Sequence, residues 1–506
     1  MARWGTPQRV GVIIASVVAL SALVALLTPL NVPGYDTSFT LAWGRDLAHR
    51  LALDFTHPSS PTPHPLALLG GWIVGFAPVQ VGFQVALGVT VAAGLTALML
   101  VGVVTYELTA SRIAVAAAVA TTALSAPVSL LVLNASTDIT YCALGLGAVL
   151  LTVRSHHTAA IAAFMVAALL RPEAVIFAVV PLVLAFAQTR AAAGTRTATR
   201  SLRVSAAWAF GLGVGLAAAA WLAMGAAGGD PLIGLHSASS NADANNNAQG
   251  THAALTGAIP GLAAATGWIT ICAAGITLVV TLLTRRRDQK SVRQSARPRH
   301  ALSSDDGAQQ RATVITGAFI GMAVLAYVAQ GLTSTPLVAR YLLLPSLLCI
   351  ALAARCVSLA GRIARTKRAS TILSTTVAVI LVASATLASL TGWRDVATAR
   401  AVRTEAFAAA SSLLDNGLAQ ECEAPFVVRS PALVALSALK LDRPLRDITV
   451  ANQAGQGVLL QPLTLDAAQL AGYGPMTPLA EQATFPTDAP PRQSNAQWAL
   501  YSACQP

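Results

Sequence analysis

The sequence predicts an all-α polytopic membrane domain followed by a small α/β domain outside the membrane. Only 11% of the 506 residues are charged, whereas soluble domains carry about 25%, and the mean hydropathy is +0.63. Apolar runs long enough to cross a bilayer recur through residues 10–392. After residue 392 they give way to short runs in which strand and helix patterns alternate.

The apolar runs predict about eleven transmembrane helices. Residues 10–30 form a continuous run of bilayer length without a small-residue cleavage site, which is typical of a retained span rather than a signal peptide. The runs at 158–170 and 174–187 are short, and two short spans or one re-entrant hairpin would both fit them. The other predicted spans are residues 80–104, 112–126, 138–153, 204–226, 258–284, 312–334, 341–357 and 370–391.

The distribution of basic residues predicts the orientation in the membrane. Most of the 33 Lys and Arg fall in alternate loops, including TRRRDQKSVRQSARPR (284–299) and GRIARTKR (361–368). The positive-inside rule then places the N-terminus in the cytoplasm and the C-terminal domain outside. These basic runs, which can also touch anionic membrane lipids, account for the net charge of +12. Nucleic acid is therefore not an expected partner.

The first outer loop begins with an amphipathic segment. In DTSFTLAWGRDLAHRLAL (36–53) apolar residues return every four positions, and Arg45 and Asp46 lie on another face. This pattern predicts a helix in the membrane interface, with Trp43 at the depth of the lipid headgroups and Arg45 on the solvated face. Asp46 and Arg50 have the i,i+4 spacing of a surface ion pair.

The rest of this first outer loop, residues 31–79 as a whole, is a kinked segment followed by a second apolar helix. THPSSPTPHP (56–65) has four prolines in ten residues, so it must be extended, and it carries His57 and His64. LALLGGWIVGF (66–76) is too short to span and predicts a second interfacial or partly inserted helix.

The division at residue 392 separates a transmembrane domain, 1–392, from an extracytoplasmic α/β domain, 393–506. The second is long enough to fold by itself. Cys422 and Cys504 lie in it, and an oxidising compartment would let them form a disulfide. Its predicted elements are a helix at 394–416 that Gly417 ends, a strand at 426–430, a helix at 431–441, and strands at 447–451 and 498–503.

A few ionisable residues lie where spans meet the outer boundary: Asp36, Asp138, Arg171, Glu173 and Arg340. Ionisable groups at this depth usually face a polar cavity or one another, which makes them candidates for a functional site. Local explanations stay open for each. Asp36 and Asp138 would both serve as helix caps, Arg171 and Glu173 as a paired turn, and Arg340 as a side chain that reaches the lipid headgroups.

The order of these features resembles the GT-C superfamily of membrane glycosyltransferases. An acid follows the first span, and an amphipathic helix and a proline-rich HPL lead to a second interfacial helix. LLRPEA (169–174) forms an outer turn, and ARYLLLP (339–345) begins a late span. The resemblance covers most of residues 10–392. It implies transfer, with inversion, of a sugar from a polyprenyl-phosphate donor to a glycan or lipid acceptor, on the outer face of a bacterial plasma membrane.

The resemblance also implies residue roles. Asp36 matches the acid that acts on the acceptor, and a carboxylate can accept the proton of an attacking hydroxyl. Arg340, followed by Tyr341, matches the arginine that holds the carrier phosphate, where a guanidinium binds in a bidentate manner. The acid has no second acid beside it of the kind that metal-using members show, so no metal cofactor is expected. The candidate substrate-binding residues are His57, His64, Asp138, Arg171 and Glu173.

Three other functions stay open at this stage. The chain could be a ligase or polymerase of lipid-linked glycans, a transporter, or a non-catalytic scaffold for envelope assembly on the same fold. A transporter would be expected to show repeated halves and paired, Gly- or Pro-broken spans with charges near the middle of the bilayer, and the sequence shows neither.

Overall fold

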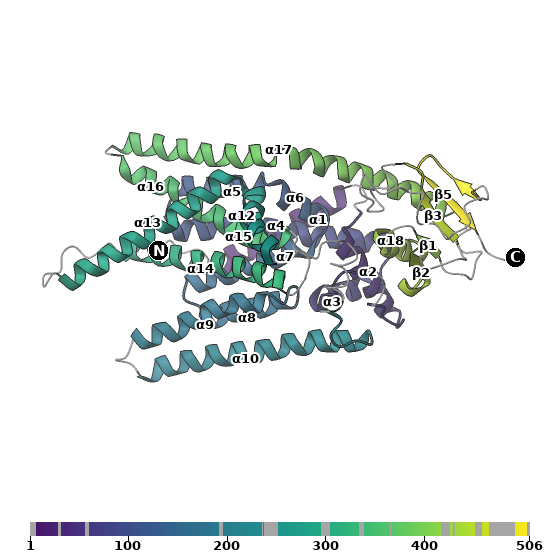
Figure 1. The fold of residues 1–506 in the computed structure, drawn as a ribbon, viewed down its shortest axis with the longest axis horizontal. Helices are drawn as coiled ribbons and strands as arrows, with labels where there is room; N and C mark the ends of the chain where they lie inside the picture. The colour runs from purple at the N-terminus through teal and green to yellow at the C-terminus, as the bar shows by residue number, and fades with distance from the viewer. Residues whose placement is uncertain are drawn as a thin grey trace.

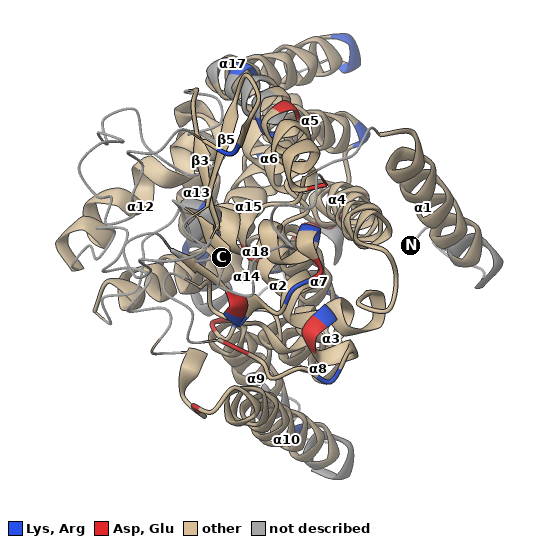
Figure 2. Cartoon of the chain, turned by 90° about the vertical axis from the view of Figure 1, so that its right-hand side faces the viewer, with Lys and Arg blue, Asp and Glu red and all other residues tan. Residues whose placement is uncertain are grey.

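The computed structural model is a long helical bundle with a small sheet at one end (Figure 1). It describes residues 7–28, 32–55, 60–191, 196–234, 236, 251–294, 304–332, 339–364, 366–415, 426–428, 431–450, 458–464 and 491–502. The strand β5 and the rest of the sheet lie at one end of the long axis, and the N-terminus lies in the other half of the molecule. Seen from the sheet end, most of the ribbon is uncharged, and acidic and basic residues appear in small groups (Figure 2).

The bundle confirms a multi-pass membrane protein but not eleven spans. Among the described residues, six helices are long and apolar enough to cross a membrane, or seven if one bent pair counts as a single span. Its helices are α1 (Pro7–Leu27), α4 (Val79–Thr109), α5 (Arg112–Ala123), α6 (Ala126–Leu133), α7 (Thr137–Val153), α8 (His157–Ala168), α9 (Ala174–Ala191), α10 (Arg196–Ala227), α12 (Thr251–Thr266), α13 (Trp268–Gln294), α14 (Ser304–Leu332), α15 (Leu343–Ala353), α16 (Arg355–Ile363) and α17 (Lys367–Leu414).

Two predicted spans are interrupted. The single span expected at 258–284 is wrong, because Gly267 adopts the left-handed conformation (φ +84°) between α12 and α13. Its amide bonds back to Ala263 O at 2.7 Å, which ends α12 as a left-handed C-cap does. The span expected at 112–126 is also shorter than predicted, because α5 ends at Ala123 and α6 continues at a bend of 55°.

One long helix joins the two predicted domains. α17 begins after Thr366, whose hydroxyl accepts the Ala369 amide at 3.2 Å, and continues to Leu414. The predicted span 370–391 and the predicted tail helix are therefore one element, and the proposed boundary at residue 392 lies inside it. Figure 1 shows α17 running along one side of the bundle and into the C-terminal domain.

The C-terminal domain has a five-stranded sheet in the order β2-β1-β3-β5-β4. β1 (Phe426–Val428) lies parallel to β2 (Ile448–Val450) and β3 (Val458–Pro462), and β5 (Trp498–Ser502) lies antiparallel to β3 and β4 (Gln493–Ser494). α18 (Pro431–Leu441) coincides with the predicted helix, and η2 (Leu445–Asp447) follows it. Two strands were not predicted from the sequence: β3, which ends on a proline, and β4. Cys422 and Cys504 lie outside the described residues, so their disulfide stays a prediction.

The first interfacial helix is covered by protein. α2 (Tyr35–Ala48) buries Trp43 to 1% exposure, and the ring stacks edge-on against Phe55 with centroids 4.9 Å apart. The same hydrophobic cluster continues into the C-terminal domain, where it includes Val434 and Trp498. The prediction that Trp43 lies at the lipid headgroups is therefore wrong, since the C-terminal domain covers this face of α2.

Arg45 and Asp46 are also buried because the C-terminal domain covers them. Their exposures are 5% and 1%, so the predicted solvated face is wrong. Arg45 Nη1 donates to Ala438 O at 2.6 Å near the end of α18, where a cation also complements the helix dipole. Asp46 accepts the Leu445 amide at 3.1 Å and pairs with Arg45 at 2.9 Å, so the pairing predicted with Arg50 is not formed.

Candidate functional site

The structure brings four of the predicted site residues together from distant parts of the chain. Asp36 is in the first turn of α2, and Asp138 is in the first turn of α7. Arg171 lies in the turn between α8 and α9, and Arg340 lies in the short 3₁₀ helix η1 (Ala339–Leu342). Each side chain comes from the end of a helix, so their meeting forms a charged centre at one end of the bundle.

These charges form a linked set of ion pairs. Arg340 Nη1 lies 2.6 Å from Asp36 Oδ2, and Arg340 Nε lies 3.6 Å from Asp138 Oδ2. Arg171 donates to the other oxygen of Asp138 through Nε and Nη2. Asp138 thus bridges two guanidinium groups, and Ser136 donates its hydroxyl to it at 3.0 Å. Glu173 lies 3.6 Å from Arg171, at the edge of the set.

The local explanations account poorly for this arrangement. The N-cap of α2 is Gly34 and not Asp36, and the N-cap of α7 is Ser136, whose hydroxyl accepts the Asp138 amide. Asp36 instead pairs with Arg340, and Asp138 is bonded to Arg171 and lies 3.6 Å from Arg340. The Arg340 side chain, 32% exposed, faces the two acids and does not extend away from them as a headgroup ligand would.

Tyr341 lies against both arginines. The Arg171 guanidinium carbon is 4.4 Å from the centre of the Tyr341 ring, and that of Arg340 is 5.9 Å away. A tyrosine face attracts cations at this distance, so the ring helps to hold two like charges near each other. The two arginines differ in access, because the side chain of Arg171 is 8% exposed whereas that of Arg340 is 32% exposed. Arg340 is therefore the cation that a ligand can reach.

His64 adds a buried imidazole beside these charges. It precedes α3 (Pro65–Val74), is 8% exposed, and meets Trp221 edge-on with centroids 5.8 Å apart. Burial, assisted by the positive charge of Arg171, lowers the pKa of His64 to about 4, although Asp36 and Asp138 act in the opposite direction. The imidazole is therefore neutral near pH 7. His57, the other histidine predicted to bind substrate, lies outside the described residues.

The lowered pKa of His64 predicts a pH dependence of stability. Between pH 6.5 and 4 the unfolded chain binds a proton at this position that the folded protein excludes, so stability falls as the pH is lowered. The full difference is worth at most about 3 kcal/mol. We expect the fall in melting temperature from pH 7.5 to pH 5 in detergent to be smaller in His64→Gln than in the wild type. His49→Gln, an exposed histidine on the same loop, is the control, and equal falls in all three proteins would contradict the expectation.

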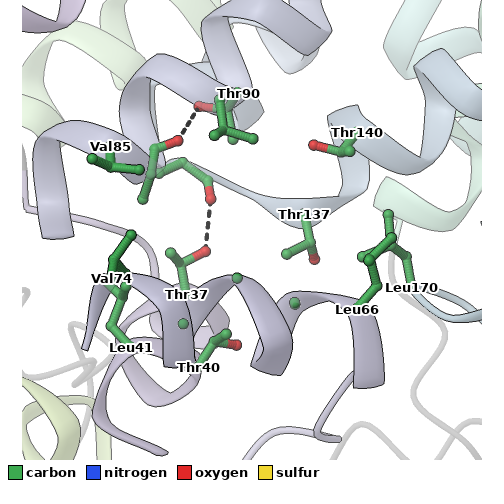
Figure 3. A pocket seen from close by; sticks show the side chains of 16 residues that line it. Thr37, Thr40, Leu41, Leu66, Val74, Val85, Thr90, Thr137, Thr140 and Leu170 are labelled. Atoms are coloured by element: carbon green, nitrogen blue, oxygen red, sulfur yellow. Dashed lines mark hydrogen bonds between the residues drawn. The ribbon is translucent and has the colours of Figure 1, made fainter. Parts of the chain in front are cut away.

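An apolar cavity of about 190 Å³ lies near the first turns of α2 and α7, although neither Asp36 nor Asp138 lines it (Figure 3). It lies among α2, α3, α4 and α7 and is lined partly by Thr37 and Thr137, the direct neighbours of Asp36 and Asp138. Thr37 donates its hydroxyl to Ala135 O at 2.7 Å, so this polar group on the wall is satisfied. The remaining lining residues are Thr40, Leu41, Leu66, Ala67, Gly70, Gly71, Val74, Val85, Ala86, Val89, Thr90, Ala135, Thr140 and Leu170.

α2 and α3 approach each other closely beside the cavity, a contact that was not predicted from the sequence. A Cβ at Gly44 would lie 2.1 Å from the backbone of Gly71, and a Cβ at Gly71 would lie 2.5 Å from Thr40 O. Neither position can accept a side chain without moving a helix. The available signal was the paired glycine in LALLGGWIVGF, which indicates a backbone-to-backbone crossing inside an apolar helix.

The arginines of the centre are suited to binding an anion. In the part of the chain that the structure describes, no three His, Cys, Asp or Glu side chains gather as metal ligands. The acids are instead paired with arginines. A phosphate could replace Asp36 on Arg340 because both offer oxygen acceptors to the same guanidinium fork.

Comparison with known proteins gives one structural likeness. No protein-family model matches the sequence, and no curated protein matches it. The crystal structure of ArnT from Cupriavidus metallidurans in the apo state aligns with 94% of this chain and 97% of its own, at 13% sequence identity and a TM-score of 0.47. These values assign no activity and no residue role to the present chain.

Proposed function

We propose that the protein is a membrane glycosyltransferase of the GT-C type. It moves a sugar from a polyprenyl-phosphate donor to a lipid or glycan acceptor on the outer face of the bacterial plasma membrane. The observation that supports this most is the ion pair of Asp36 with Arg340, together with an apolar cavity that Thr37, the next residue along α2, helps to line. A base, a phosphate ligand and a site for an apolar chain are the three elements that such a transfer needs.

Arg340 is the proposed ligand of the donor phosphate. It is the more exposed of the two arginines, and its partners are carboxylate oxygens that a phosphate can replace. Arg171 is held by Asp138 and Glu173 and keeps Asp138 in place. When the phosphate binds Arg340, Asp36 loses its counter-ion.

Asp36 is the proposed general base. It accepts the proton of an acceptor hydroxyl, and the hydroxyl oxygen forms the new bond to the anomeric carbon of the sugar. The bond from that carbon to the phosphate oxygen breaks in the same displacement, which inverts the configuration. The electron pair leaves with the polyprenyl phosphate, and Arg340 stabilises the charge that develops on it.

The cavity is the proposed entrance for the polyprenyl chain. Val85 and Val89 line it and are 40% and 53% exposed, so α4 presents an apolar surface on the outside of the bundle at this point. A chain that enters from the lipid along α4 would bring its phosphate toward Arg340. The hydroxyls of Thr37 and Thr90 on this wall donate to the backbone carbonyls of Ala135 and Val132, which satisfies these two polar groups.

A transporter is the alternative function that the helix breaks suggest, because broken spans are common at transport sites. The break at Gly267 lies between Thr266 and Trp268, and the bend at Ser125 lies between Leu124 and Ala126. These are uncharged residues, whereas the charged centre lies at helix ends elsewhere. The geometry therefore favours a transferase.

Binding of the carrier lipid tests the proposal. A fifty-five-carbon polyprenyl phosphate added to the protein in nanodiscs is expected to raise the melting temperature. At a concentration of a hundred times its Kd, the lipid would stabilise the folded protein by about 2.7 kcal/mol. The same polyprenol without phosphate should give little change, because Arg340 would remain paired with Asp36. Equal shifts for the two lipids would contradict a phosphate site. A panel of polyprenyl-phosphate sugars then identifies the donor by release of polyprenyl phosphate.

A further inference from the structure

One arginine outside the charged centre contacts the loops that lead to both acids. Arg403 is on α17, beyond the apolar part of that helix. Its Nη2 donates to Pro33 O at 2.7 Å, and its Nη1 donates to Asn134 Oδ1 at 3.1 Å. Pro33 precedes Asp36 by three residues, and Asn134 precedes Asp138 by four.

The same two loops are also tied to each other. The Gly34 amide donates to Asn134 O at 2.7 Å, and Thr37 donates to Ala135 O at 2.7 Å. The loops approach so closely that a Cβ at Gly34 would lie 3.0 Å from Asn134 O. The starts of α2 and α7 therefore form one small unit, and Arg403 closes it from the side of α17.

The position of this unit decides how the acids meet Arg340. The Arg340 guanidinium reaches one carboxylate at 2.6 Å and the other at 3.6 Å, so a shift of either loop would break one contact. Both partners of Arg403 are neutral oxygens. Burial lowers the pKa of Arg403, because desolvation disfavours the cation. A buried arginine with only neutral partners is therefore energetically unfavourable if it merely fills space. Its planar guanidinium is, however, suited to bridging two acceptors.

We propose that Arg403 is a positioning residue that holds Asp36 and Asp138 in register by bridging Pro33 and Asn134. It does not touch the substrates. The effect on transfer rests on the proposed function, but the effect on the two loops does not. The experiment therefore measures loop stability and transfer separately, with the full-length protein in nanodiscs.

Hydrogen exchange tests the bridge itself. Arg403→Gln is expected to speed amide exchange about tenfold or more in the segments around Gly34 and Asn134, because both lose a tie to α17. Arg394→Gln, an exposed arginine on the same helix, is the matched control and should leave these segments unchanged. Arg403→Lys should lie between the two, since an ammonium keeps the charge but lacks the fork. Unchanged exchange in Arg403→Gln would overturn the proposal whatever the activity.

Transfer kinetics distinguish positioning from substrate contact. Arg403→Gln is expected to lower kcat by about 10- to 100-fold, as a misplacement of about 1 Å can. The KM for the polyprenyl-phosphate donor should change less than about threefold, and Arg403→Lys should restore part of kcat. A raised KM with normal kcat would overturn the proposal by placing Arg403 on the substrate. If the wild-type protein transfers no sugar but Arg403→Gln still speeds exchange in the two loops, the bridge is supported and the proposed function is contradicted.

Discussion

Asp36→Asn is expected to lower sugar transfer by about a hundredfold or more, because an amide cannot accept the proton of the acceptor hydroxyl. The asparagine side chain keeps the shape of the aspartate and can still accept a hydrogen bond from Arg340, whose Nη1 lies 2.6 Å from Asp36 Oδ2 in the wild-type structure. The helix loses no cap, since the N-cap of α2 is Gly34. Expression and melting temperature should therefore stay close to the wild type, and transfer from the identified donor measures the effect.

The matched control is Asp415→Asn, an acid that pairs with Lys440 at 2.8 Å in the C-terminal domain and is 64% exposed. It should leave transfer unchanged. Normal transfer by Asp36→Asn would remove Asp36 from the mechanism. Glu173 would then be the better candidate for the base. Asp138 pairs with two guanidinium groups, whereas Glu173 pairs with one, at the longer distance of 3.6 Å.

The members of the charged centre could be predicted from sequence because of where they lie. Charge is rare in this chain, and an ionisable residue at the end of an apolar run has few partners other than its own kind. The sequence therefore predicts Asp36, Asp138, Arg171 and Arg340 as site residues, and the structure brings them together. The sequence could not give their pairing. That Asp138 bridges both arginines depends on the relative positions of η1 and the α8–α9 turn, which no local pattern encodes.

Other features depend on partners that are distant in the chain. Arg45 reads as a solvated residue of an amphipathic helix, yet its acceptor is Ala438 O, 393 residues later. Arg403 reads as one basic residue on an ordinary helix, although it bonds to Pro33 O, 370 residues earlier. The periodicity of a single segment identifies its apolar face correctly and says nothing about a polar face that a later domain covers.

Arg340→Ala is expected to weaken polyprenyl-phosphate binding by about tenfold or more, since a charge-assisted hydrogen bond to phosphate contributes about 1.5–3 kcal/mol. Transfer should fall further, because the same contact stabilises the leaving group. Arg340→Lys should recover little, because one ammonium cannot span Asp36 and Asp138 or bind phosphate in a bidentate manner. The shift in melting temperature with polyprenyl phosphate measures binding. Arg362→Ala, which breaks a half-exposed pair with Asp306, is the control.

Combining Asp36→Asn with Arg340→Ala tests whether the pair acts in one step. If Arg340 holds the leaving phosphate while Asp36 takes the acceptor proton, the two act on a single transition state. Loss of one then leaves little for the other to contribute, as in other catalytic groups that act as a unit. The double variant should therefore transfer sugar about as slowly as the slower single variant. Fully multiplicative losses would contradict this coupling. If Arg340→Ala binds the lipid and transfers sugar normally, Arg340 serves only as a counter-ion of the two acids in the wild type.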